Sequence, residues 1–236
     1  MTSEGVARRA FLKVAAVAGA AAAAPAATSP PAVADGAAAP DAGSPPPVYA
    51  FLNLEEQAFV EALVDHMIPA DELTPKGTDL GISIYIDRAL GGAWGRGDRL
   101  YMQGPWKRGV PSQGYQLPLT PAQLYRAGIE ATNAHCLKTW GKPFDRLAEA
   151  QREEVLVALS AGTLDLGQLP ARTFFATIYQ TVMEGMFADP VYGGNRNKAG
   201  WRMIGFPGAL AVHREHVAQY RDQPFPAEPV GIADMS

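Results

Sequence analysis

One segment near the middle of the chain carries the signals of both ends of a helix. Thr120 is a favourable N-cap, Pro121 takes the first helical position, and Gly141 is the residue type that commonly ends a helix. Between these ends one face of the predicted helix carries Tyr125, Ile129, Thr132, Cys136 and Trp140. A helix-length repeat of this kind does not fit a strand, so this segment predicts a long helix with one buried face.

Further segments combine a helical repeat with a start or stop signal. Asn53 is a good N-cap, and Glu56 stands where a capping box needs it. The isoleucines from 82 to 86 alternate like a strand, but the same stretch fits a helix, and the Gly91-Gly92 stop favours a short helix. The predicted helices cover residues 53–68, 82–90, 120–141, 148–161 and 170–188, with at most a short one around 198–204.

Two long segments have no clear period and are rich in glycine, proline and aromatic residues. They cover residues 91–119 and 191–209. Irregular stretches of this length inside a domain usually have a role such as binding, and their aromatic side chains are costly to leave in water. The last residues carry the sequence PFPAEP and predict an extended tail. The expected fold is all-α, with about five helices and two long Gly/Pro/aromatic-rich loops.

The start of the chain predicts a removable export signal. Arg8 and Arg9 are adjacent, and an apolar run of eleven residues follows at 14–24. That run is too short to span a bilayer, and Ala32-Val33-Ala34 offers a cleavage site. Twin-arginine signals carry folded proteins. We therefore expect a signal at 1–34, a Pro/Ala-rich linker at 35–47, and a helical domain with an extended tail at 48–236.

Charge and hydrophobicity restrict the possible partners. The predicted signal holds three basic residues and one acidic residue, so its removal changes the formal net charge from −4 to −6. No basic stripe or Lys/Arg run is present, which argues against nucleic-acid binding. No second apolar stretch approaches about 18 residues, so we expect no transmembrane segment in the mature chain.

Cys136 is the only cysteine of the chain. It excludes an internal disulfide and any cysteine-based zinc, iron–sulfur or haem attachment site within this chain. Two interpretations stay open for it: a buried and inert thiol, or a disulfide to a partner chain after export.

Catalytic motifs are not found in the sequence. It contains no dinucleotide-binding fingerprint, phosphate-binding loop or nucleophile elbow. His213 and His216 lack obvious further metal ligands, and Asp71-Glu72 reads most simply as a turn. We therefore predict no catalytic, cofactor-binding or metal-binding residue. The cluster Asn195-Arg196-Asn197 is the most unusual polar group, suited either to contact with an acidic partner or to an internal role.

Several segments together resemble a known family. They are HMIPADELTP (66–75), YIDRALGG (85–92), YMQGPW (101–106), PSQGYQLPLTPAQLYRAG (111–128) and MEGMFADPVYGGNRNKAGWRMIGFPGA (183–209). The chain resembles the small (gamma) subunit of bacterial membrane-bound gluconate 2-dehydrogenase, a family shared with small subunits of related FAD-dependent sugar dehydrogenases.

The resemblance implies an assembly of three parts. A large flavoprotein subunit binds FAD and oxidises D-gluconate to 2-keto-D-gluconate, and a multihaem cytochrome c subunit passes the electrons on. The small subunit is non-catalytic, brings the signal for the twin-arginine translocase, and helps the flavoprotein to fold. It resides in the periplasm, held at the inner membrane by its partners. A sister complex for glucose, fructose or sorbitol, a self-standing periplasmic enzyme, and a dedicated chaperone that leaves after export are the alternatives.

Aromatic and arginine side chains in the two loops are the expected contacts with the partner, because interface cores favour these residue types. The predicted interface residues are Trp106, Tyr115, Tyr192, Arg196, Trp201 and Phe206. Cys136 is the candidate for an intersubunit disulfide.

Overall fold

The computed structural model describes residues 48–98, 100–107, 109–110, 113–209, 214–226 and 228–235. The predicted signal with Arg8 and Arg9, the predicted linker and His213 all lie outside these ranges.

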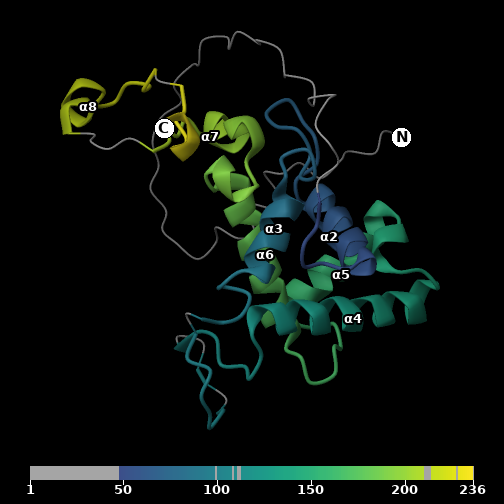
Figure 1. The fold of residues 1–236 in the computed structure, drawn as a ribbon. Coiled ribbons are helices and arrows are strands. Elements are labelled where there is room, and N and C mark those ends of the chain that lie inside the picture. The colour runs from purple at the N-terminus through teal and green to yellow at the C-terminus, as the bar shows by residue number, and fades with distance from the viewer. Residues whose placement is uncertain are drawn as a thin grey trace. The chain divides into compact units, whose positions relative to one another are not determined.

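The described chain is helical, which confirms the predicted fold class (Figure 1). Its α-helices are α2 (Leu54–Met67), α3 (Ile82–Gly91), α4 (Pro121–Trp140), α5 (Glu149–Ala161), α6 (Ala171–Phe187), α7 (Ala199–Ile204) and α8 (Arg214–Gln219). Short 3-10 helices are η2 (Phe144–Arg146), η3 (Pro190–Tyr192), η4 (Arg196–Lys198) and η5 (Ile232–Met235). The five long helices match the predicted ones, and the two short α-helices bring the described total to seven.

The predicted helix ends are formed by the predicted residues. At the start of α2, the Asn53 side chain accepts a hydrogen bond from the Glu56 N–H at 2.9 Å, and the Glu56 carboxylate accepts one from the Asn53 N–H at 3.0 Å. Thr120 and Gln123 make the same reciprocal pair at the start of α4. Gly141 ends α4 in the left-handed conformation at φ 69°. These caps satisfy helix-end groups that would otherwise need water.

Helix α6 lies at the centre of the bundle, and α3, α4, α5 and α7 all pack against it (Figure 1). Its buried face contains Phe174, Ile178 and Val182, which are fully inaccessible to solvent. Burying an apolar side chain of this size contributes about 1.5–3 kcal/mol. This face therefore holds the helices together.

The contact between α4 and α6 is unusually close. Gly128 of α4 faces the ring of Phe174, and a Cβ at position 128 would lie 2.3 Å from that ring. Next to this contact, the buried hydroxyl of Tyr125 is hydrogen-bonded to that of Thr181. The missing side chain at Gly128 thus allows the two helices to approach.

Asp87 of α3 anchors the segment that leads into α2. It is 1% exposed, and its carboxylate accepts hydrogen bonds from the backbone N–H groups of residues 50, 51 and 52, at 2.8, 3.0 and 2.8 Å. A buried carboxylate is tolerated when such donors satisfy it. The anchor fixes where the chain enters the helical body.

The sequence predicts an extended C-terminal tail; the described residues of PFPAEP are non-helical, but the tail is not extended throughout. Helix α8 precedes this stretch and η5 follows it. The chain then returns to the body, because the Val230 N–H donates to the Pro207 carbonyl at 3.0 Å and the Ala209 N–H donates to the Val230 carbonyl at 2.7 Å. These hydrogen bonds join backbone to backbone, so they cannot be predicted from the pattern of side chains in the sequence.

Candidate partner-binding surface

The predicted polar cluster 195–197 lies in a tightly bound loop between α6 and α7. Asn195 is fully buried. Its Oδ1 accepts a hydrogen bond from the Gly200 N–H at 2.8 Å, and its Nδ2 donates to the Ala188 carbonyl at 2.9 Å. One side chain thus joins the end of α6 to the start of α7, which is the internal role that the sequence suggested for an asparagine here.

The backbone of this loop adopts conformations that are rare for residues other than glycine. Asn195, Asn197 and Lys198 have φ angles of 46°, 57° and 57°. Each such residue costs about 1–2 kcal/mol, although asparagine pays less than most. The surrounding contacts must hold this conformation, and strained loops of this kind are concentrated at binding sites.

Arg196 is exposed on this loop, at the start of α3. Its backbone N–H donates to the Leu80 carbonyl at 3.0 Å. Here the backbones of Gly81 and Gly193 touch, because a Cβ on Gly81 would lie 2.4 Å from the Gly193 carbonyl oxygen. Both glycines also have positive φ angles, 75° and 107°, so a larger residue fits at neither position. The backbone of Arg196 is therefore fixed while its side chain reaches solvent.

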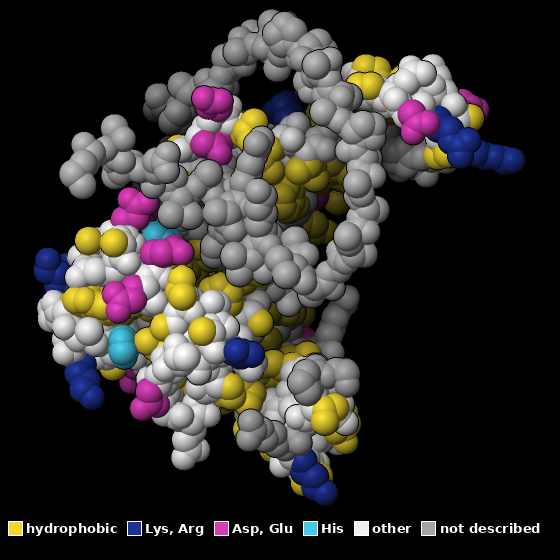
Figure 2. Space-filling model, turned by 180° about the vertical axis from the view of Figure 1, so that it is seen from behind, with side chains coloured by type: hydrophobic (Ala, Val, Ile, Leu, Met, Phe, Trp, Pro, Cys, Tyr) yellow, Lys and Arg dark blue, Asp and Glu magenta, His cyan; other side chains and the backbone are white. Residues whose placement is uncertain are grey.

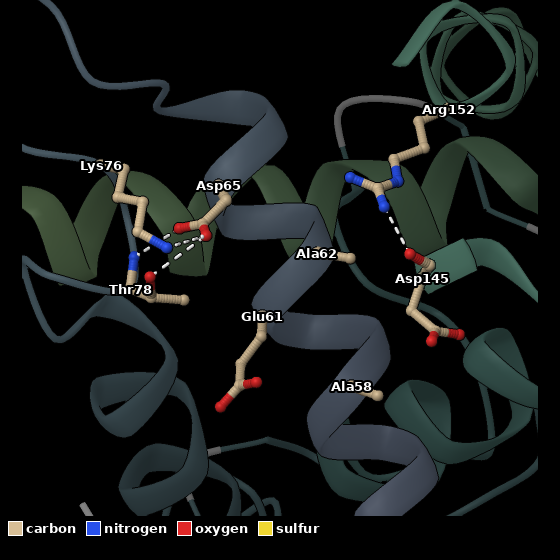
Figure 3. Close-up of a pocket in the computed structure, with 8 residues that line it drawn as sticks. All are labelled: Ala58, Glu61, Ala62, Asp65, Lys76, Thr78, Asp145 and Arg152. Atoms are coloured by element: carbon tan, nitrogen blue, oxygen red, sulfur yellow. Dashed lines mark hydrogen bonds and ion pairs between the residues drawn. The ribbon is translucent and has the colours of Figure 1, made fainter. Parts of the chain in front are cut away.

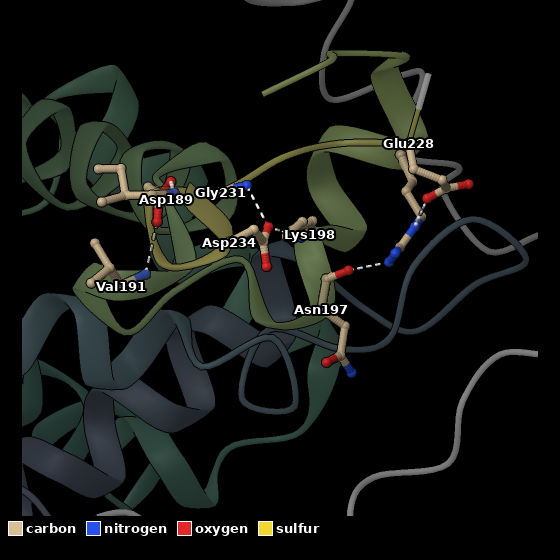
Figure 4. Close-up of polar contacts among 9 residues, drawn as sticks. Asp189, Val191, Asn197, Lys198, Glu228, Gly231 and Asp234 are labelled. Carbon is tan, nitrogen blue, oxygen red and sulfur yellow. Dashed lines mark hydrogen bonds and ion pairs between the residues drawn. The ribbon is translucent and has the colours of Figure 1, made fainter. Parts of the chain in front are cut away.

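The C-terminal tail is bound to the same region (Figure 4). Asp234 pairs with Lys198 and accepts a hydrogen bond from the Gly231 N–H at 2.7 Å. The Lys198 hydrogen bond lowers the pKa of Asp234 below its usual range. Asp189 accepts a hydrogen bond from the Ile232 N–H at 2.8 Å. We refer to these contacts, together with the backbone bonds of Val230, as the tail clasp.

Exposed apolar side chains are numerous around the tail clasp. Single exposed apolar residues are ordinary, but the hydrogen bonds of the clasp bring several segments that carry them side by side. They are Val191 at 48%, Tyr192 at 56%, Phe206 at 43%, Ile232 at 47% and Met235 at 59% exposure. Apolar side chains gathered in this way are typical of protein–protein contact sites.

The sequence predicts that Trp201 contacts the partner, but it is buried inside the chain and does not lie on this surface. It is 4% exposed, its Nε1 donates to the Phe187 carbonyl at 2.6 Å, and its ring packs edge-on against Phe206 at 5.3 Å. Trp201 is the largest side chain of the short helix α7 and is buried where this helix packs on the body, so it supports the ring of Phe206 and is not accessible to a partner.

The two other predicted residues lie in the loop that follows α3. Trp106 is 37% exposed. Tyr115 is half-buried, its hydroxyl donates to the Leu119 carbonyl at 2.6 Å, and burial raises its pKa to about 12. This loop leaves the C-terminal end of α3 (Figure 1), whereas the Arg196 N–H is bound to Leu80, just before the N-terminal end of α3. The predicted residues thus form two separate groups.

Cys136 lies on the buried face of α4 and is fully inaccessible. Burial raises the pKa of its thiol to about 11, which disfavours the reactive thiolate. Of the two interpretations, the structure shows the buried thiol. A disulfide from Cys136 to a partner does not fit this position, because the sulfur has no access to the surface.

An open polar hollow of about 490 Å³ lies beside α2 (Figure 3). Its charged side chains are largely engaged with this chain: Asp65 binds Lys76 at 2.9 Å and accepts from the Thr78 N–H at 2.8 Å, while Arg152 donates to the backbone carbonyl of Asp145. The Asp65 hydrogen bond raises the pKa of Lys76. The hollow is open, and its charged side chains bind groups of this same chain. No catalytic arrangement is visible in it.

The described part of the chain offers little else of chemical interest. Within those ranges no three His, Cys, Asp or Glu side chains gather as a metal site would require. None of the described helices is both long and apolar enough to cross a bilayer. Seen from behind, Lys and Arg side chains are scattered among acidic and apolar ones (Figure 2). His216 packs against Phe225 at 4.9 Å.

A comparison with protein families gives one clear match. The family model of gluconate 2-dehydrogenase subunit 3 matches residues 54–208. No curated protein matches the chain, and no solved structure does. The matched region begins with α2 and ends at Gly208, just before the tail.

Proposed function

Because the chain belongs to the gluconate 2-dehydrogenase subunit 3 family, we propose that it is the non-catalytic small subunit of a periplasmic FAD-dependent dehydrogenase complex. The family match covers all the long helices and the loop that carries Arg196, so it applies to the whole helical body. This match is the observation that carries the proposal.

The small subunit acts on its partner by binding it. It associates with the large FAD-binding subunit in the cytoplasm, stabilises it, and brings the twin-arginine signal for both chains. The predicted pair Arg8 and Arg9 supports the export step, since such signals carry folded cargo. The exposed apolar side chains around the tail clasp and in the loop after α3 support a lasting protein contact.

The redox chemistry belongs to the partners. FAD resides in the large subunit, and haem c resides in a multihaem cytochrome c subunit that holds the complex at the outer face of the inner membrane. D-Gluconate, oxidised to 2-keto-D-gluconate, is the substrate that the family name favours. The small subunit contributes surface and stability and no reacting group.

Co-purification tests this proposal. A tagged form of the mature chain is isolated from the periplasm and from detergent-solubilised membranes of its native host, and the flavin and haem absorbance of the product are recorded. We expect a stoichiometric yellow partner of flavoprotein size, with haem present in the membrane fraction. A chain that is isolated alone and colourless would refute the subunit proposal and would call for assays of independent activity.

The same preparation identifies the substrate. Bleaching of the flavin absorbance after addition of D-gluconate, and not after glucose, fructose or sorbitol, is the expected result. Bleaching by one of the other sugars would assign the complex to a sister enzyme while leaving the role of the small subunit unchanged.

A further inference from the structure

Two arginines converge on the contact between Gly81 and Gly193. A Cβ on Gly193 would lie 3.0 Å from Nη1 of Arg88, and a Cβ on Gly81 would lie 3.8 Å from Nη2 of Arg196. Arg88 comes from α3 and Arg196 from η4, so two elements far apart in sequence bring their guanidinium groups to one place. Both side chains are exposed.

Neither arginine has an acidic partner among the described residues. The neighbouring cations differ in this respect, since Lys198 pairs with Asp234 and Arg202 pairs with Glu228 at 3.1 Å. The chain as a whole has more acidic than basic residues, 24 against 20. Acidic side chains are therefore plentiful, and those among the described residues still leave these two guanidinium groups without an ion pair.

The backbone of Arg196 is held firmly, and Arg88 stands on helix α3. The Arg196 backbone is bound to the Leu80 carbonyl, and buried Asn195 fixes the residue before it. A strained loop that fixes the backbone and exposes a charge is suited to binding a group of the opposite sign. Tyr192, 56% exposed, lies in the same loop and provides apolar surface beside the charges.

We propose that Arg88 and Arg196 together bind carboxylates of an acidic segment on the flavoprotein subunit, so that this pair sets the orientation of the complex. The inference rests on the proposed function and names the chemistry of the partner surface. A planar guanidinium group binds a carboxylate through two parallel hydrogen bonds, in bidentate fashion. Opposite charges across an interface fix the orientation of the two partners. Anionic lipid is the less suitable ligand, because membrane patches commonly use about four to eight basic residues, and the neighbouring Lys198 is already paired with Asp234.

Charge reversal tests the proposal. The tagged complex is prepared with the small subunit unchanged, with Arg88→Glu and Arg196→Glu together, or with the control Arg221→Glu. Arg221 is also an exposed arginine without an ion pair among the described residues, but it lies in the tail beyond α8. The flavin retained per small subunit is measured at increasing salt concentration, and circular dichroism verifies that each variant is folded.

We expect the double variant to bind the flavoprotein about tenfold or more weaker, while the control binds as the unchanged chain does. The milder variant with Arg88→Gln and Arg196→Gln removes both charges without introducing negative ones, so it disturbs the fold less. Its binding to the flavoprotein should no longer depend on salt concentration. A double variant that retains the flavoprotein with an unchanged salt profile overturns this inference and leaves the proposed function standing.

Two further outcomes separate the remaining cases. If the unchanged small subunit retains no flavoprotein, the proposed function fails, and this inference fails with it. If the isolated unchanged subunit binds phosphatidylglycerol vesicles and the double variant loses that binding while retaining the flavoprotein, the arginines serve lipid headgroups and the inference is overturned.

Discussion

Asp87 accepts hydrogen bonds from three successive backbone N–H groups, so its removal should be costly. Asp87→Ala leaves the donors of residues 50–52 without a partner, and we expect a loss of about 2–4 kcal/mol in the free energy of unfolding. Urea denaturation of the mature chain, followed by circular dichroism, measures it. Asp98→Ala is the matched control, because Asp98 makes an exposed pair with Arg96 that is worth at most about 1 kcal/mol. Equal losses in the two variants would contradict the anchoring role.

The thiol of Cys136 should resist reagents in the folded protein. Its pKa of about 11 lies above the ordinary value, so at pH 8 nearly all of it is the unreactive thiol, and burial adds a steric barrier. Mass spectrometry after treatment with iodoacetamide should show no modification of the native chain during the time in which the urea-unfolded chain reacts completely. Raising the pH to about 11 while the fold persists should produce only a slow increase. Rapid modification of the native chain would show that the sulfur is accessible after all.

The roles of some single residues could be predicted from the sequence, and those of others could not. Capping residues such as Asn53 and Thr120 act on the backbone of the next few residues, so their effect can be predicted from spacing alone. Asp87 and Asn195 act on segments that the fold brings near, and no local pattern reveals which donors they satisfy. Trp201 shows the same limit, because an aromatic residue in a glycine-rich loop reads equally well as a surface contact and as a buried side chain.

At the level of helices, the contact of α4 with α6 depends on Gly128. An alanine in an open helix is favoured over glycine by about 1 kcal/mol, but a Cβ here would meet the Phe174 ring at 2.3 Å. The clash should outweigh the propensity, so Gly128→Ala should destabilise the fold by about 1–3 kcal/mol. Urea denaturation of the single variants and of Gly128→Ala with Phe174→Leu measures the coupling. The smaller leucine makes room, so the double variant should lose less than the sum of the two single losses. Strict additivity would show that the two residues do not limit the approach of the helices.

The long helices could be predicted because each carries its own repeat and its own ends, whereas the tail could not. Its return to the body uses backbone bonds of Val230 and the pairing of Asp234 with Lys198, 36 residues away in sequence. Such contacts depend on the tertiary structure. The charged residues of the Pro-rich tail do not indicate which distant residues they will contact. The pair of Arg88 and Arg196 was hidden for the same reason, since the glycine contact that joins them exists only in the folded chain.

For the whole chain, the helical body and the tail should be separable in stability. The family match ends at 208, and the tail is held mainly by the exposed contacts of the clasp, so a chain that ends at residue 209 should keep its helical body. We expect its far-ultraviolet circular dichroism to be nearly unchanged and its thermal midpoint to fall by only a few degrees, about the effect of 1 kcal/mol. Full unfolding of the shortened chain would show instead that the tail is part of the cooperative unit. Arg202→Ala, which removes the pairing with Glu228 and the hydrogen bond to the Asn197 carbonyl but leaves the tail in place, is the milder control.

Export should depend on the pair at the start of the chain, and for the flavoprotein as much as for the small subunit. Arg8→Lys with Arg9→Lys keeps both charges but removes the twin-arginine signal, which is read as an address by the export machinery. If the small subunit brings the signal for both chains, dehydrogenase activity and flavin should accumulate in the cytoplasmic fraction and be lost from the periplasm and membranes. Lys13→Gln changes the charge of the same region but keeps the arginine pair, so it should export both chains normally. A flavoprotein that still reaches the periplasm in the double-lysine strain, while the small subunit stays behind, would mean that it is exported independently, and the escort role would have to be abandoned.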